Sequence, residues 1–160
     1  MDKKIFSLLC RTQFNIFCWE LSVDKYKRYD KIISIFSAIV SSSSIATWAI
    51  WKHLDWLWAI IIAASQVLTI LKPYFPYFKY ATELNNKKHE LKALNTNVAE
   101  LWNKIQNKRI SEKEASEAYF GFKKQIITIE DFETDFTPDK KTKEKAKEEL
   151  NKFLKNEKLN

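Results

Sequence analysis

Turn-forming residues are scarce in this chain of 160 residues, which contains one glycine and three prolines. Hairpins and tight turns in β-sheets depend heavily on glycine and proline, because these residues adopt the backbone angles that turns require. A fold built from several strands would need more of them than the chain contains. We therefore expect an all-α protein.

Cysteine and histidine are also scarce, with two of each. Cys10 and Cys18 lie more than two helical turns apart, too far for a disulfide within one helix, so we expect reduced thiols that face a core or lipid. Together with His53 and His89 they form no metal-ligand spacing. Because no glycine-rich phosphate loop or nucleophile motif is present either, we expect no enzyme, no metal and no cofactor.

Charge is absent from two long stretches, residues 32–51 and 56–71. A helix rises about 1.5 Å per residue, so twenty residues cover a hydrocarbon core of roughly 30 Å. The sequence therefore predicts a two-helix transmembrane hairpin within residues 31–80. A hairpin buried inside a globular protein is the weaker alternative, because the remaining chain offers little apolar sequence to cover it.

Basic residues flank this pair of stretches on the outside, while the connection at 52–55 is nearly neutral. Basic flanks stay in the cytoplasm. We therefore expect a multi-pass protein of the bacterial inner (cytoplasmic) membrane, with the lipid bilayer as a partner and both termini cytosolic. Residues 1–30 would form an amphipathic N-terminal helix, and residues 81–160 a cytosolic helical domain for ligand binding and oligomerisation.

Hydroxyl groups recur at helical spacing in the first uncharged stretch, and the second contains one strongly polar residue. The set comprises Ser34, Ser37, Ser41, Ser44 and Gln66. Small polar residues in apolar helices typically mark helix–helix contacts, and the same face could instead line a water-filled pore. Both interpretations remain open, and both place Gln66 toward protein or water.

A helix is predicted over residues 4–30 by a stripe of apolar side chains spaced three and four apart. The stripe comprises Phe6, Cys10, Phe14, Phe17 and Leu21. Such a helix could lie on the membrane surface or pack against the C-terminal domain.

A second helix is predicted over residues 80–110, where apolar residues follow a heptad pattern. They are Leu84, Leu91, Val98 and Ile105 at intervals of seven, with Leu94 and Leu101 at the three-residue offset. This pattern is typical of a partly coiled-coil seam. The seam could gather several chains, or pack on the C-terminal helices of its own chain.

Two further helices follow from cap signals. Ser111 and Glu114 form a capping-box pattern, which predicts a helix from Glu112 to about Ile127. Within it, Gly121 would allow another backbone to approach closely. Thr137 before Pro138 predicts a last helix that begins at Pro138.

A candidate ligand-binding site gathers cations, an amide and an aromatic ring near the turn between the second and third of these helices. The residues are Lys104, Asn107, Lys108, Arg109, Tyr119, Lys123 and Lys124. Cations before a helix N-terminus favour phosphate, and an aromatic ring can stack on a base. The alternative is a plain basic face, since basic patches are common.

The order of these elements resembles a known class of proteins. A basic amphipathic segment, two close hydrophobic stretches and a long helix containing Leu101 and Trp102 are similar in layout to two-transmembrane effectors of bacterial antiphage systems. These include SLATT-like effectors and the membrane effector of type III CRISPR systems, whose cytosolic part binds cyclic oligoadenylate. The resemblance covers residues 4–125 in layout, and no site residue carries over position by position.

The resemblance implies a non-enzymatic effector of antiviral defence. A homo-oligomer, which we expect to be a tetramer, would bind a cyclic nucleotide, with cyclic oligoadenylate favoured and duplex nucleic acid excluded, and would gate a pore or membrane disruption. A holin-like pore former without a ligand is one alternative. A membrane scaffold that recruits a partner through the heptad helix is another.

Overall fold

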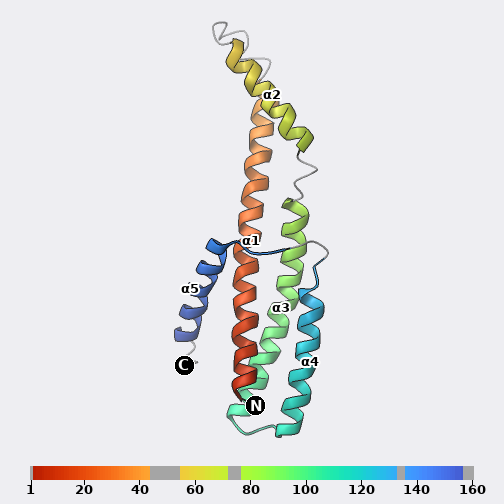
Figure 1. Cartoon of the computed structure of the whole chain (residues 1–160), viewed down its shortest axis with the longest axis vertical. Helices are drawn as coiled ribbons and strands as arrows, with labels where there is room; N and C mark the ends of the chain where they lie inside the picture. Colours follow the sequence, from red (N-terminus) through yellow and green to blue (C-terminus); the bar gives the residue numbers. More distant parts are fainter. Residues whose placement is uncertain (1, 44–54, 72–76, 133–135, 157–160) are drawn as a thin grey trace. The chain divides into compact units, whose positions relative to one another are not determined.

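The computed structural model describes residues 2–43, 55–71, 77–132 and 136–156, and within these ranges it is all-α with no strand, as predicted. Its helices are α1 (Asp2–Ser43), α2 (Asp55–Leu71), α3 (Tyr77–Gln106), α4 (Glu112–Glu130) and α5 (Lys140–Asn156). Figure 1 shows their order along the chain. The chain divides into two compact units: residues 1–23 together with 82–160, and residues 24–81. We call them the bundle unit and the middle unit.

The predicted transmembrane hairpin, and with it the multi-pass position in a bacterial inner membrane, was wrong. Within the described ranges, no helix combines the length and the apolarity needed to cross a bilayer. α1 is long, but it carries six charged residues between positions 24 and 31. α2 has 17 residues, which is shorter than the roughly 20 that a span requires. Residues 44–51 of the first expected span lie outside the described residues.

The first 22 residues of α1 form the centre of the bundle unit, with α3, α4 and α5 around them (Figure 1). Of the two alternatives for this helix, packing against the C-terminal residues is therefore the one observed. The predicted stripe is not the most buried face of the helix, because its five members are only half-buried. The buried face follows the same spacing of three and four but comprises Ile5, Leu9, Thr12, Ile16, Trp19 and Val23.

The heptad residues of α3 are buried inside this single chain. Leu84 is 2% exposed, and Leu91 and Val98 are fully buried, while Leu94 and Leu101 at the three-residue offset are nearly so. Ile105, the last member, is half-buried. The apolar area of the seam is thus removed from water without a second chain, which favours packing on the chain's own helices over a coiled coil between chains.

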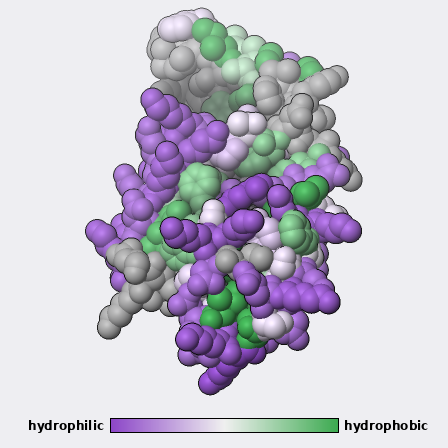
Figure 2. Space-filling model, turned by 60° about the horizontal axis from the view of Figure 1, so that its bottom comes forward, coloured by the Kyte–Doolittle hydropathy of each residue, from purple (hydrophilic) through white to green (hydrophobic). Residues whose placement is uncertain are grey.

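Polar and aromatic contacts fix α1 against α4 and the segment that follows it. Glu130, the last residue of α4, accepts a hydrogen bond from Asn15 (2.6 Å) and forms an ion pair with Arg11 (2.7 Å). One turn further along α1, the Trp19 ring meets Phe132 edge-on at 5.2 Å. The face turned forward in Figure 2 is mostly hydrophilic.

The N-terminal cap of α4 is the one predicted from the sequence, whereas the N-terminal cap of α5 is a different residue from the one predicted. The capping box is confirmed: the Glu114 amide donates to the Ser111 hydroxyl (3.3 Å), and the Ser111 amide donates to the Glu114 carboxylate (3.0 Å). The Ser111 hydroxyl also donates to the Glu114 carboxylate at 2.6 Å, and this bond, together with the one from the Ser111 amide, lowers the pKa of Glu114. α5 begins at Lys140 rather than Pro138, because the Asp139 carboxylate accepts from the Thr142 amide at 2.7 Å and serves as the cap.

Gly121 packs against nothing: a methyl group at its Cα would meet no atom within 4 Å. The expected close backbone approach is therefore not observed. Gly121→Ala should raise the free energy of unfolding by about 1 kcal/mol, because alanine removes the helix-propensity penalty without a steric cost. Urea titration followed by circular dichroism measures this. Ala118→Gly, the reverse change one turn earlier on α4, should lower the free energy of unfolding. Equal free energies of unfolding for Gly121→Ala and wild type would contradict the prediction.

Candidate functional site

A pocket of about 310 Å³ lies in the bundle unit between α1, α3 and α5. Small-molecule sites are typically concave and largely apolar, with a few convergent polar groups. This pocket has that composition: aliphatic and aromatic side chains form its walls, and carboxamides supply its polar groups. The lining residues are Leu9, Asn95, Ala99, Trp102, Asn103, Gln106, Asn107 and Phe153. We call it the amide pocket.

One face of α3 builds most of the amide pocket. Its five contributions, from Asn95 to Gln106, follow one another at steps of one, three or four residues, which keeps them on adjacent rows of the helix, and Asn107 of the following turn adds a sixth. The inner end is fixed by a buried network. Asn95 is 9% exposed, its Oδ1 accepts from the Thr12 hydroxyl, and its Nδ2 donates to Gln13 Oε1 at 2.7 Å. This end of the pocket is therefore rigid and polar.

The aromatic walls are held by α1. The Trp102 ring lies 5.3 Å from the Phe6 ring, at an interplanar angle of 42°. The Phe153 ring of α5 lies 6.4 Å from Phe17, edge to face. Because each wall rests on a ring of the central helix, the pocket does not depend on a loop for its shape.

The polar groups of the pocket can both donate and accept hydrogen bonds. Asn95, Asn103, Gln106 and Asn107 each carry a carboxamide. Two of them are linked, since Asn107 Nδ2 donates to the Asn103 carbonyl (2.9 Å) and side-chain oxygen (2.5 Å). This combination suits a flat, uncharged heterocycle that offers donors and acceptors along its edge, such as a nucleobase.

Directly after the pocket residues, α3 ends in a tight turn. The Lys108 amide donates to the Ile105 carbonyl (3.0 Å), and the Arg109 amide donates to the Lys104 carbonyl (2.8 Å). This pair of bonds is the Schellman motif, in which the residue at position 108 adopts a left-handed conformation. Lys108 does so, with φ of 53°, at a position where glycine is the usual residue. The chain thus places a lysine where the backbone disfavours it.

Lys108→Gly should raise the free energy of unfolding by about 1 kcal/mol, because glycine adopts the left-handed conformation without steric strain. Lys108→Ala is the matched control: it removes the same charge but keeps the strain. Thermal denaturation of both variants compares them. If the glycine variant were no more stable than the alanine variant, the turn would not be strained at Lys108.

The structure brings together four of the seven predicted ligand-binding residues. Lys104, Asn107, Lys108 and Arg109 lie at the C-terminal end of α3 and in the turn, and Asn107 lines the amide pocket. Lys104 is paired with Glu100 at 2.7 Å, which partly neutralises it.

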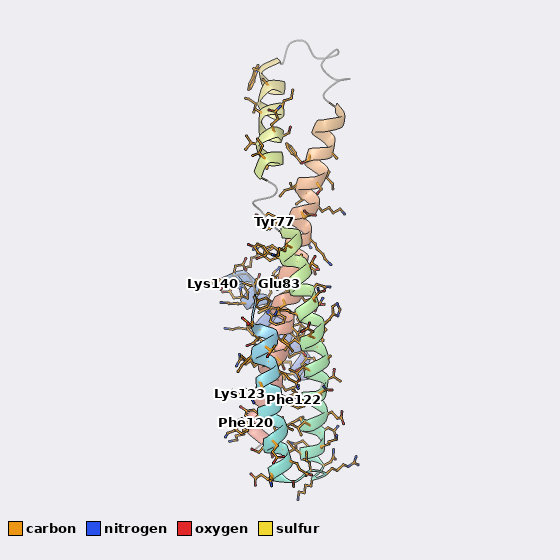
Figure 3. The ribbon with its side chains drawn as sticks, turned by 90° about the vertical axis from the view of Figure 1, so that its right-hand side faces the viewer. Tyr77, Glu83, Phe120, Phe122, Lys123 and Lys140 are labelled. Atoms are coloured by element: carbon orange, nitrogen blue, oxygen red, sulfur yellow. The ribbon has the colours of Figure 1, made fainter. Side chains whose placement is uncertain are left out.

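The other three residues lie further along α4, away from the turn. Lys123 is eleven residues beyond the start of α4, roughly 16 Å along the axis. Figure 3 labels it beside Phe120 and Phe122. Lys124 is exposed nearby, and Tyr119 packs against Phe120 at 5.3 Å. One chain therefore does not join these three residues to the turn in a compact site.

The predicted packing or pore residues belong to the middle unit. Ser34 and Ser37 are half-buried on α1, and Gln66 is exposed on α2. Ser41 lies on α1 but its side chain is outside the description, and Ser44 lies outside the described residues.

Sequence reasoning missed the walls and most of the amides of the pocket. The available signal was the recurrence of asparagine and glutamine on one side of α3 around Trp102. Phe153 could not be found this way, because its place depends on how α5 packs.

The described residues hold no cluster of histidine, cysteine or carboxylate side chains suited to a metal ion. Both cysteines are free, and burial raises the pKa of Cys18 to about 11. Comparisons of the chain with protein-family models, with curated proteins and with solved structures give no match.

Proposed function

We propose that this chain is a non-enzymatic effector whose bundle unit binds a cyclic oligonucleotide, with cyclic oligoadenylate as the first candidate. The observation that carries the proposal is the amide pocket, which adjoins a turn bearing Lys108 and Arg109. One base would enter the pocket and the neighbouring phosphate would meet the two cations. The antiviral role and the preference for cyclic oligoadenylate come from the resemblance in layout.

Adenine is the base that we expect the pocket to prefer. Asparagine and glutamine carboxamides form paired hydrogen bonds with the adenine amino group and ring nitrogen. Stacking on an aromatic side chain contributes about 1–3 kcal/mol per base. Trp102 and Phe153 offer such rings beside Asn103 and Gln106.

The phosphate would be held by side chains rather than by the end of α4. The N-terminus of α4 is filled by its own capping box, and Glu112 and Glu114 place negative charge there. The expected phosphate attraction of this helix end is thereby cancelled. Lys108 and Arg109 are both exposed and are the cations that immediately follow the pocket residues.

The alternatives have less support. The holin-like pore former and the membrane-disrupting output both required membrane-spanning helices, so neither is carried forward. A scaffold that binds its partner through the heptad helix would need the seam to be open, whereas Leu91 and Val98 are fully covered within the chain.

Calorimetric titration of the full chain with cyclic oligoadenylates and cyclic dinucleotides tests the proposal. We expect an adenylate ring to bind at least tenfold more tightly than guanine-containing ligands. Arg109→Glu should weaken that binding by tenfold or more, since a charge-assisted contact contributes about 1.5–3 kcal/mol. Lys124→Glu, an equally charge-reversing change on α4, should have little effect. No binding to any ligand, or an equal loss in both variants, would contradict the proposed site.

A further inference from the structure

In the middle unit, α2 carries a stripe of large apolar side chains that face outward. Trp56 and Ile70 are each 65% exposed, and Ile60 and Val67 are more than half exposed. Their spacing of four, seven and three residues places all four on one face of the helix. The other side of α2 is turned inward, since Ser65 and Leu68 are half-buried. An apolar face of this length normally marks a contact surface.

The composition of the stripe fits another helix. Ala59 and Ala63 are exposed between the large residues, and small residues at such positions let two helix backbones approach closely. Gln66 is also exposed at the edge of the stripe. A single amide in an apolar seam fixes the register of paired helices, because its hydrogen bonds need a partner of the same kind.

We infer that the stripe on α2 pairs with the same stripe of a second copy of this chain. From Trp56 to Leu71 the helix contains no charged residue, so it offers nothing to recognise a charged partner. It is instead self-complementary, with large and small residues that can interlock and an amide that can meet its equivalent. A two-fold interface requires this kind of self-match.

The part of α1 in the middle unit also carries exposed apolar side chains. Ile32, Ile35 and Phe36 on α1 are exposed and are spaced three and one residues apart, on one side of that helix. Exposed apolar area of this kind associates in water because burial removes it from solvent, at about 25 cal/mol per Å².

A lipid surface is the competing occupant. Lipid chains would match the isoleucines equally well, but they offer no partner for Gln66 and gain nothing from Ala59 and Ala63. The pairing also makes a specific geometric prediction. Gln66 meets its equivalent only if the two helices run parallel, and in that arrangement Ala63, at the middle of the stripe, faces Ala63 of the partner subunit.

Cysteine cross-linking tests this geometry in the full chain with Cys10 and Cys18 replaced by alanine. Ala63→Cys should form a disulfide-linked dimer under mild oxidation. Ala64→Cys, the adjacent exposed alanine, points about 100° away and should not. Equal cross-linking at both positions would overturn the proposal, because it would indicate non-specific association.

Sedimentation gives an independent measurement. Wild type should be a dimer, and Ile60→Lys combined with Val67→Lys should be a monomer. Ile127→Lys, at a comparably exposed isoleucine on α4, should sediment like wild type. A monomeric wild type would overturn the proposal. So would binding to phosphatidylcholine vesicles that abolishes the Ala63→Cys cross-link, since the stripe would then face lipid.

Discussion

Leu91→Ala is expected to lower the free energy of unfolding by about 2–5 kcal/mol, the usual cost of truncating a fully buried leucine. Leu91 is 0% exposed and lies in the middle of the heptad seam, where α3 packs in the bundle unit. The removed methyl groups lose their contacts and leave a cavity that the neighbouring helices fill only in part. Urea titration followed by the helical circular dichroism signal measures the loss.

Ile127→Ala provides the control, because Ile127 is 63% exposed and should tolerate truncation with a change below about 0.5 kcal/mol. The expected result of Leu91→Ala is different if the heptad seam of α3 joins several chains instead of packing within one chain. Leu91→Ala would then reduce the size of the sedimenting species while each chain stayed folded. That outcome would contradict the packing of the seam within one chain.

Ala99→Leu is expected to weaken ligand binding by tenfold or more while leaving the fold intact. Ala99 lines the amide pocket, so a larger aliphatic side chain occupies the space that the base would take. The variant changes neither charge nor any hydrogen-bonding group. Stability should stay within about 1.5 kcal/mol of wild type, because the added atoms fill an existing cavity of about 310 Å³. Denaturation of the unliganded variant verifies this.

Ala93→Leu is the control for Ala99→Leu. It makes the same substitution on α3 at an exposed position outside the pocket. Its affinity for the ligand should match that of wild type. If both variants bound as wild type does, the ligand would not occupy the amide pocket.

The helices and their caps could be predicted because the signals that produce them are local. The capping box at Ser111 and the seven-residue spacing on α3 depend only on nearby sequence. The buried face of α1 could not be chosen in the same way. Apolar side chains lie on several sides of α1. Phe6 and Phe17 are half-buried because α3 covers one side of the helix and α5 covers another. A central helix has no single stripe, so periodicity alone selects the wrong one.

The membrane prediction failed for a related reason. Counting uncharged residues treated positions 32–51 as an independent segment, whereas α1 runs without interruption from Asp2 to Ser43 through a charged region. The site was predicted in part: the cations of the turn follow one another in the sequence. The pocket beside them needs Leu9, Trp102 and Phe153 from three helices, and no local pattern brings those residues together.

We propose that the amide pocket holds a base of a cyclic adenylate ligand. The most direct test is a side-by-side calorimetric titration of wild type and Ala99→Leu with cyclic tetra-adenylate. We expect saturable binding to wild type and at least tenfold weaker binding to Ala99→Leu. Equal affinity of the two proteins, or no heat of binding from well-folded wild type, would contradict it.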